Sequence, residues 1–153
     1  MILTTKGRYA VLAIIDIADS ADSEKATPLF AISQRQNISL SYLEQIFTKL
    51  RKAEIVKSSK GPGGGYFLNK DPKEITIAEI INAIGEPIRI TSCSNKKEGC
   101  ISNKETSKKC KTHDLWHGLE KRIYDYLYSI SLYDVCSSSF PKFYQTTNNN
   151  FLS

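Results

Sequence analysis

Apolar residues recur at helical spacing early in the chain, before any stretch that alternates like a β-strand. Residues 6–19 carry an apolar side chain at every third or fourth position and follow Thr4-Thr5, which suits a helix N-cap. Pro28 suits the first turn of a second, shorter helix that ends near Arg35. The pattern therefore predicts two helices joined by a polar loop over 20–26.

A third helix is predicted over 41–52, where Ser41-x-x-Glu44 matches a capping box. Its apolar residues fall at positions i, i+3, i+4 and i+7 and are Leu43, Ile46, Phe47 and Leu50. A stripe with this spacing packs against a core. The opposite face is polar and cationic and carries Ser41, Tyr42, Gln45, Thr48, Lys49 and Lys52. We therefore expect a helix with a buried back and an exposed, hydrogen-bonding front.

Two short strand-like runs, 55–59 and 66–68, flank a turn that is rich in glycine. The five residues of the turn, 61–65, include four glycines and a proline, and glycine lets a hairpin tip approach another backbone closely. A helix–turn–helix followed by a β-hairpin is the order of a winged helix. The pattern thus predicts a winged-helix DNA-binding domain over 1–70.

A connecting helix and a polar loop are expected next. Thr76-x-x-Glu79 is a second capping box, and Gly85 suits a helix stop, so the connecting helix is predicted within 71–90. Residues 91–113 are rich in Lys, Ser and Asn and predict a loop. A loop of this length in a compact chain suggests that something organises it.

A dimerisation helix is predicted over 114–135, as a long helix to about Ile130 and a last short turn that Ser131 caps, through Val135. The tail over 136–153 is expected to be disordered. The apolar positions of the long helix step by three and four residues, as in a coiled coil, and are Trp116, Leu119, Ile123, Tyr126 and Ile130. This seam packs either against the chain's own core or against a second copy, and we favour a homodimer. The fold class is therefore mainly α with a small β-hairpin: a winged helix-turn-helix plus a long C-terminal dimerisation helix.

The charge distribution favours a polyanionic partner for the first half of the chain. Of the 153 residues, 1–70 hold 10 Lys and Arg against 6 Asp and Glu, whereas 71–153 hold 11 against 10. Excess positive charge over the winged helix is consistent with binding to double-stranded DNA. A basic protein with no nucleic-acid partner is the alternative on charge alone.

The sequence also excludes several classes of protein. It shows neither an apolar stretch of membrane-spanning length nor the layout of a signal peptide, so we expect a cytoplasmic protein with no membrane partner. It shows no Ser/His/Asp set, no paired carboxylates and no phosphate-binding loop, so we do not expect an enzyme.

Polar residues on the third helix and at the glycine-rich turn are candidates for DNA contacts. The hydroxyls of Ser39, Ser41 and Tyr42 suit phosphates and base edges. Glu44 can accept a hydrogen bond from a cytosine amino group. Lys60, at the shoulder of the turn, can enter a minor groove. Lys49, Arg51 and Lys52 suit phosphates. An amphipathic helix and a surface hairpin without a partner remain the alternative.

Three of the four cysteines, Cys93, Cys100 and Cys110, fall within 18 residues, and His113 follows the third of them by three positions. Thiolates and an imidazole bind zinc or an iron–sulfur cluster. The spacing does not distinguish these metals: zinc would be redox-silent, whereas an iron–sulfur cluster would be oxidisable. Free surface thiols are a further alternative. Cys136 and His117 lie outside this pattern.

Several segments resemble winged-helix transcription regulators of the IscR type, which control iron–sulfur cluster assembly. These segments are 3–10 (LTTKGRYA), 38–45 (ISLSYLEQ), 50–52 (LRK) and 61–66 (GPGGGY). The wing motif is typical of the wider winged-helix family, and the three cysteines followed by Cys-x-x-His and Leu-Trp narrow the resemblance to the IscR type. The resemblance covers roughly residues 1–135.

The resemblance implies a homodimer that binds palindromic promoter operators and holds one 2Fe–2S cluster per subunit. The implied cluster ligands are Cys93, Cys100, Cys110 and His113. The implied function is repression of iron–sulfur biogenesis genes, with cluster occupancy changing which operators are bound. The positions that match the family's DNA contacts are Ser39, Ser41, Tyr42, Glu44, Gln45 and Lys60.

Two departures from the family and two alternatives qualify this interpretation. The family's wing carries arginine where this chain has Lys60, and the ligand loop over 91–113 is longer than usual. One alternative is a nitric-oxide-sensing repressor of the same fold, although that branch generally lacks the histidine ligand. The other is a zinc-stabilised interaction protein without a DNA partner.

Overall fold

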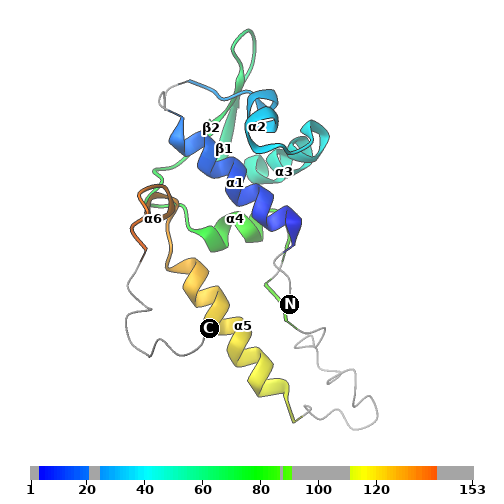
Figure 1. The fold of residues 1–153 in the computed structure, drawn as a ribbon, viewed down its shortest axis with the longest axis vertical. Helices are drawn as coiled ribbons and strands as arrows, with labels where there is room; N and C mark the ends of the chain where they lie inside the picture. The colour runs from blue at the N-terminus through cyan, green and yellow to red at the C-terminus, as the bar shows by residue number, and fades with distance from the viewer. Residues whose placement is uncertain (1–3, 21–24, 87, 91–110, 141–153) are drawn as a thin grey trace, which may run out of the picture.

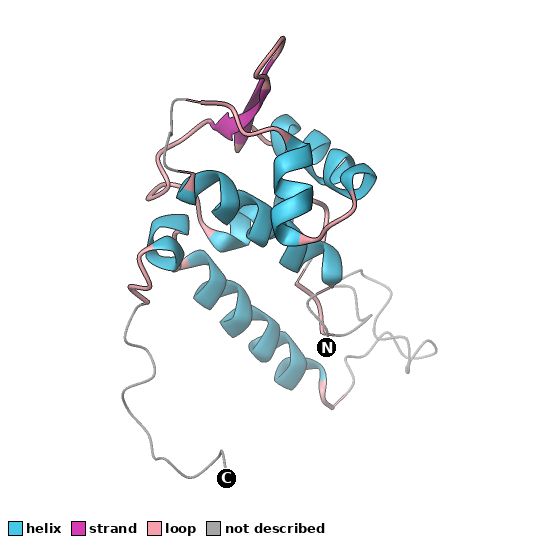
Figure 2. Cartoon of the chain, turned by 45° about the horizontal axis from the view of Figure 1, so that its top comes forward, coloured by secondary structure: helices cyan, strands magenta, loops and turns pink. Residues whose placement is uncertain are grey.

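A computed structural model describes residues 4–20, 25–86, 88–90 and 111–140. The elements in chain order are α1 (Thr5–Asp19), α2 (Leu29–Gln36), α3 (Leu40–Lys52), β1 (Val56–Ser59), β2 (Gly65–Leu68), α4 (Ile77–Ala83), α5 (His113–Tyr128) and α6 (Leu132–Cys136). The β1–β2 hairpin projects from one end of a cluster of short helices, and α5 extends from the opposite end (Figures 1 and 2). The predicted fold class, mainly helical with one small hairpin, is confirmed.

The helix ends follow the local chemistry of the sequence. Thr4 is the N-cap of α1, and its hydroxyl accepts a hydrogen bond from the Gly7 amide at 3.4 Å. The capping box predicted at Thr76 and Glu79 is present at the start of α4. Gly85 has a φ of 75°, a left-handed conformation that ends the helix at little cost for glycine.

The core lies where α1, α3 and α4 meet, with α2, β1 and the end of α5 around it. Its fully buried large side chains come from these elements and include Ile14, Ile32, Leu43, Ile46, Phe47, Leu50, Ile80, Ile81 and Ile84. The predicted stripe on α3 is thus the back of the helix. None of the helices described here is both long enough and apolar enough to cross a membrane.

The junction between α5 and α6 is joined to the start of α4 by backbone hydrogen bonds. The Ile77 amide donates to the Ile130 carbonyl at 3.0 Å, and the Leu132 amide donates to the Ile75 carbonyl at 2.8 Å. A capping box at Ser131 then starts α6, as expected for a last short turn. Because Ile130 and Leu132 are also buried, α5 leaves the core from a well-anchored point.

A buried carboxylate links α1 to α2. Asp16 is 8% exposed, and it accepts hydrogen bonds from Arg35 Nε at 3.1 and 3.2 Å, from the Arg35 guanidinium Nη2 at 2.5 Å and from Gln36 Nε2 at 2.8 Å. Burial raises the pKa of Asp16, but the hydrogen bonds from Arg35 and Gln36 and the charge of Arg35 outweigh it, so the pKa lies below its ordinary value. These contacts therefore join α1 directly to α2.

The Asp16→Asn substitution is expected to lower the free energy of unfolding by about 1–3 kcal/mol at neutral pH, because Arg35 loses its charged acceptor. The folded pKa is below the ordinary value of 3.8, so this contribution is complete above that pH and is lost as the pH falls through the folded pKa. Urea denaturation of both proteins over a pH series measures the difference. A difference that persists unchanged into strong acid would contradict the assignment.

Candidate nucleic-acid interface

The third helix presents a polar face to solvent because its apolar face is fully used by the core. Its four stripe residues are all 0% exposed. On the other face, Ser41, Glu44 and Gln45 are exposed, while Tyr42 is half-buried. The helix is thus held by its back, and its front is free to enter a groove of DNA.

The capping box predicted at Ser41 and Glu44 is wrong. The helix begins at Leu40, so Ser39 is the N-cap residue, and the Ser39 side chain makes no capping hydrogen bond. The start is displaced because Asn37, at the end of α2, takes a left-handed conformation with a φ of 52°, which turns the chain directly into α3. The displacement leaves the hydroxyl of Ser41 and the carboxylate of Glu44 outside any role in capping.

Tyr42 is positioned by an aromatic contact with α1. Its ring lies edge-on to that of Tyr9, with 5.8 Å between centroids and an interplanar angle of 90°. Edge-to-face pairs of this kind add to the stability that comes from apolar burial. The contact therefore fixes α3 against α1 near the N-terminal end of α3, where Ser39 and Ser41 lie.

The hairpin is held close to α3 and to the connection between α1 and α2. The ring centroids of Tyr66 on β2 and Phe47 on α3 lie 4.8 Å apart. Tyr66 also pairs with Thr27: the Thr27 amide donates to the Tyr66 carbonyl at 2.8 Å, and the Tyr66 amide donates to the Thr27 carbonyl at 2.9 Å. The sequence pattern predicts only a polar loop before Thr27 and gives no sign of this bridge, since a single bridge leaves no period in a sequence.

Glycine is required at two kinds of position in the wing. Gly61 and Gly63 at the tip have φ values of 94° and 76°, which L side chains rarely adopt. Gly65 is required for space, because a Cβ there would lie 2.3 Å from the Thr27 carbonyl oxygen. Lys60 is exposed at the shoulder of the same turn.

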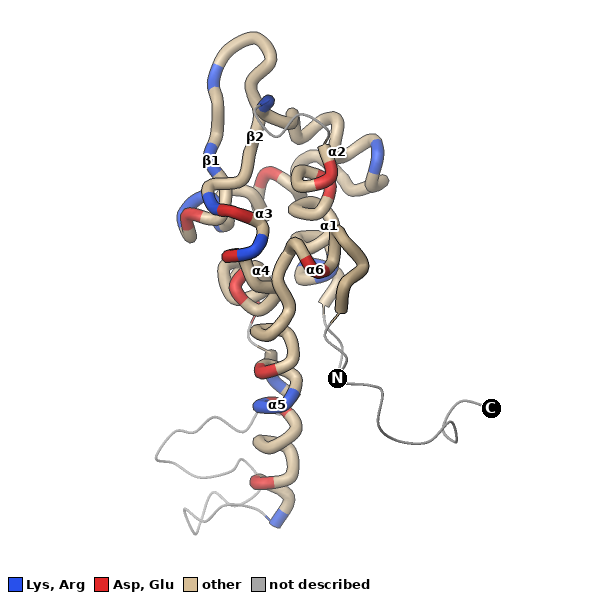
Figure 3. The backbone as a smooth tube through the Cα atoms, turned by 90° about the vertical axis from the view of Figure 1, so that its left-hand side faces the viewer, with Lys and Arg blue, Asp and Glu red and all other residues tan. Residues whose placement is uncertain are grey.

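Exposed Lys and Arg residues lie along the hairpin and on α3, beside the polar face of that helix. Figure 3 shows Lys and Arg positions along the β1 arm of the hairpin and on α3. They include Arg51, Lys52, Lys57 and Lys60, all of which are exposed. Exposed cations beside a polar helix face are suited to the phosphates that flank a groove.

Of the four predicted cluster ligands, the structure describes only His113. It is the first residue of α5 and is half-buried. Its ring stacks with that of His117, at 6.2 Å between centroids and an interplanar angle of 15°. Cys93, Cys100 and Cys110 lie outside the described residues. Within the ranges that are described, no three His, Cys, Asp or Glu side chains are grouped as a metal site.

The fourth cysteine, Cys136, lies in α6 and is half-buried. Burial, together with the charge and hydrogen bond of Asp19, raises the pKa of its thiol to about 11. The thiolate is the form that binds metals. Cys136 therefore stays protonated at neutral pH, in keeping with its position outside the predicted ligand pattern.

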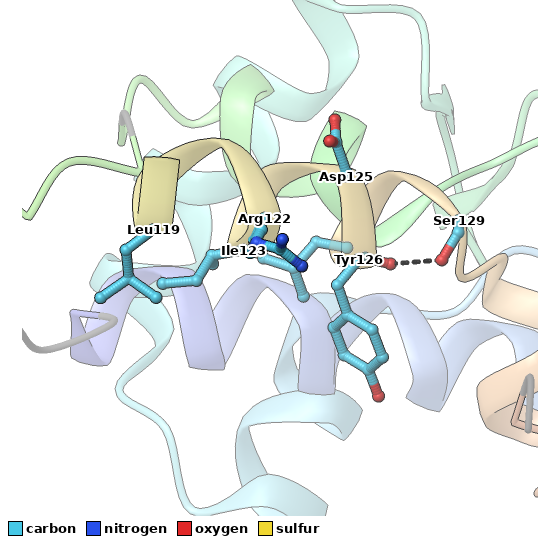
Figure 4. A pocket seen from close by; sticks show the side chains of 7 residues that line it. Leu119, Arg122, Ile123, Asp125, Tyr126 and Ser129 are labelled. Atoms are coloured by element: carbon cyan, nitrogen blue, oxygen red, sulfur yellow. Dashed lines mark hydrogen bonds between the residues drawn. The ribbon is translucent and has the colours of Figure 1, made fainter. Parts of the chain in front are cut away.

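The predicted seam on α5 is exposed to different degrees along its length. None of the residues of α5 is fully buried, and Trp116 is 38% exposed. Further along, a groove of about 620 Å³ is lined by Leu119, Arg122, Ile123, Asp125, Tyr126, Leu127 and Ser129. Figure 4 shows Leu119, Ile123 and Tyr126 along one side of the helix, with the Ser129 hydroxyl bonded to the Tyr126 carbonyl. The last seam residue, Ile130, is buried.

A polar reading helix with a glycine-rich, basic hairpin beside it defines a DNA-binding protein of the winged-helix class. The model of the Rrf2 family, described as iron-dependent transcriptional regulators, matches residues 3–138. The chain belongs to this family.

Individual relatives agree with the family assignment. The chain is 49% identical to the HTH-type transcriptional regulator IscR of Photorhabdus laumondii over 138 residues, which is 90% of this chain and 80% of that protein. It is 51% identical to IscR of Aliivibrio salmonicida over 132 residues, covering 86% and 75% of the two chains. Because such relatives are transcriptional regulators, the expectations of a DNA-binding transcription regulator and of a protein that is not an enzyme are confirmed.

Solved structures with the same fold include two regulators. CymR, the global cysteine regulator of B. subtilis, superposes with a TM-score of 0.72 at 31% identity and covers 91% of this chain and 98% of its own. IscR of T. potens superposes with a TM-score of 0.70 at 31% identity, over 90% and 88% of the two chains. The same fold is therefore shared by a cysteine regulator and by an IscR protein, so the fold by itself does not specify the signal that a regulator senses.

The Gly65→Ala substitution is expected to lower the free energy of unfolding by about 1–3 kcal/mol, because the added methyl group meets the backbone of Thr27. Amide exchange at Thr27 and Tyr66 should accelerate, and affinity for DNA should fall as the hairpin shifts. The matched control is Gly118→Ala, since nothing lies within 4 Å of a Cβ at Gly118; it should stabilise helix α5 by up to about 1 kcal/mol. Equal effects of the two substitutions would contradict the close approach at Gly65.

Proposed function

We propose that this chain is a homodimeric repressor that regulates genes of iron–sulfur metabolism and senses iron–sulfur status through a 2Fe–2S cluster. The observation that carries the proposal is the exposed polar front of α3 beside the basic wing, in a chain that also holds three clustered cysteines and a histidine. Membership of an iron-dependent family and the similarity to IscR proteins support it.

In this proposal α3 reads the major groove and the wing contacts the adjacent backbone or minor groove. Ser39, Ser41 and Tyr42 donate to phosphates and base edges, and Gln45 adds an amide donor and acceptor on the same face. Glu44 discriminates between sequences, because a carboxylate that faces bases needs a donor to meet it. Lys60 neutralises phosphate, although it lacks the bidentate geometry of the arginine expected from the family.

The chemistry of the proposed ligand set fits an iron–sulfur cluster. Three cysteine thiolates and one imidazole are soft and borderline donors that suit iron in such clusters. Cys93, Cys100, Cys110 and His113 would hold the cluster, which would supply an oxidisable group. His113 is placed by the first turn of α5, so it ties the ligand segment to the helix that we propose as the dimer contact.

The homodimer is proposed from the apolar side of α5. A single chain leaves every α5 side chain at least partly exposed, and the side chains of Leu119, Ile123 and Tyr126 line one groove. A second copy of α5 would cover this surface, and two-fold symmetry would match a palindromic operator. One wing domain alone makes few phosphate contacts, which also favours a dimer.

The DNA contacts are tested with a duplex that the wild-type protein selects from a random-sequence pool. Lys60→Ala is expected to weaken binding to all sequences and to reduce the salt dependence by about one phosphate contact, whereas Glu44→Ala should relax sequence preference and leave the salt dependence unchanged. Lys60→Arg is the matched control and should bind at least as tightly as the wild type. If Ser41→Ala, Glu44→Ala and Lys60→Ala all bind like the wild type, the reading surface is wrongly assigned.

The cluster is tested by anaerobic purification, followed by a visible spectrum and by iron, sulfide and zinc analysis. We expect a coloured protein with about two iron and two sulfide ions per chain. His113→Ala should retain less iron than His117→Ala, because only His113 is a proposed ligand. A colourless protein with stoichiometric zinc would replace the sensor with a zinc-stabilised regulator, and the opposite order of the two variants would refute the choice of histidine.

A further inference from the structure

The ammonium group of Lys49 on α3 is hydrogen-bonded within the protein. Lys49 Nζ donates a hydrogen bond to the Ile84 carbonyl oxygen at 2.9 Å, and Ile84 is the C-cap residue of α4. The carbonyls at the end of a helix carry partial negative charge and attract cations. The sequence-based interpretation of Lys49 as a phosphate contact is therefore replaced by a contact within the protein.

The surroundings of this contact are charged on both sides. Lys6 on α1 lowers the pKa of Lys49 below its ordinary value, through a hydrogen bond and through repulsion, while Glu86 acts in the opposite direction. Gly85 lies next to the ammonium group: a Cβ at that position would be in ordinary contact with Lys49 Nζ, at 3.5 Å. The contact thus joins α3 to the end of α4, with the like charge of Lys6 on α1 close by.

The chain that leaves this contact leads directly to the cysteine-bearing segment. Ile88 packs against the core, and the Ile90 amide donates to Glu120 Oε1 on α5 at 2.6 Å. Ile84 is therefore bonded to the reading helix and Ile90 is bonded to α5. All three basic residues in the last turn of α3, Lys49, Arg51 and Lys52, are exposed, and Arg51 and Lys52 are the two that we assign to phosphates.

We propose that Lys49 is a positioning residue that couples residues 88–90 to the reading helix, because it bonds the last turn of α3 to the Ile84 carbonyl at the end of α4. A displacement of residues 88–90 then moves α3 relative to the DNA through this hydrogen bond. The inference rests on the proposed cluster-sensing function and names one contact through which the signal reaches the interface. Coupling through a physical contact of this kind requires that both ends bias the same element.

The test compares Lys49→Met with Lys52→Met, which removes an exposed charge from the same helix turn. Affinity for the selected duplex is measured for cluster-loaded and cluster-free protein at several salt concentrations. Lys49→Met is expected to reduce the ratio of the two affinities at least about threefold, against a typical allosteric effect of about 5- to 150-fold, with an unchanged salt dependence. Lys52→Met should weaken both forms equally and reduce the salt dependence by about one contact. Lys49→Arg keeps a donor and should restore the ratio.

Amide hydrogen exchange of the cluster-free protein gives a readout that needs neither DNA nor cluster. Lys49→Met should accelerate exchange at residues 84–86 relative to Lys52→Met. Unaltered exchange would show that the hydrogen bond from Lys49 to the Ile84 carbonyl does not hold these residues. A Lys49→Met protein that keeps the wild-type affinity ratio, or that loses salt dependence as Lys52→Met does, would overturn the coupling while leaving cluster sensing intact. Equal affinity of the two wild-type forms would instead overturn cluster sensing itself, and the coupling with it.

Discussion

The burial of α4 is the constraint around which the other elements are arranged. This helix has only seven residues, Ile77–Ala83, and four of them are buried. So short a helix is unstable alone, and it persists because α1, α3 and α5 cover it on several sides. Its polar residue Glu79 is used in the capping box, so the helix stays intact at the centre of the fold.

The division of α3 into a buried back and an exposed front follows from this packing. Because the back is closed by the core, the front keeps a single orientation, and the side chains that meet DNA do not have to stabilise the fold. The wing shares this property, since its tip projects beyond the helices (Figure 1). A scaffold of this kind allows the reading residues to change while the core is retained.

The fold was largely predictable from the sequence because its signals are local. The helix periods, the capping box at Thr76 and the glycine-rich turn are each contained in a short stretch of sequence. The N-cap of α3 was predicted at Ser41 instead of Ser39, two residues too late, because the two serines are chemically equivalent caps and only the left-handed turn at Asn37 selects between them. The polar front of α3 was likewise readable from its pattern.

The interactions that escaped prediction join residues far apart in the chain. The pair of Asp16 and Arg35 and the contact of Lys49 with Ile84 depend on how helices cross, which no local pattern encodes. On the sequence alone, Lys49 is as suitable for phosphate as Lys52. Only the position of the α4 terminus distinguishes the two lysines.

The bridge between Thr27 and Tyr66 has a consequence for how such regulators diverge. The orientation of the wing is determined partly by the connection between α1 and α2, a stretch that does not itself meet DNA in the proposed arrangement. Substitutions in that connection can therefore redirect the hairpin while every DNA-facing residue stays the same. Two paralogues with identical reading helices could in this way come to prefer different promoters.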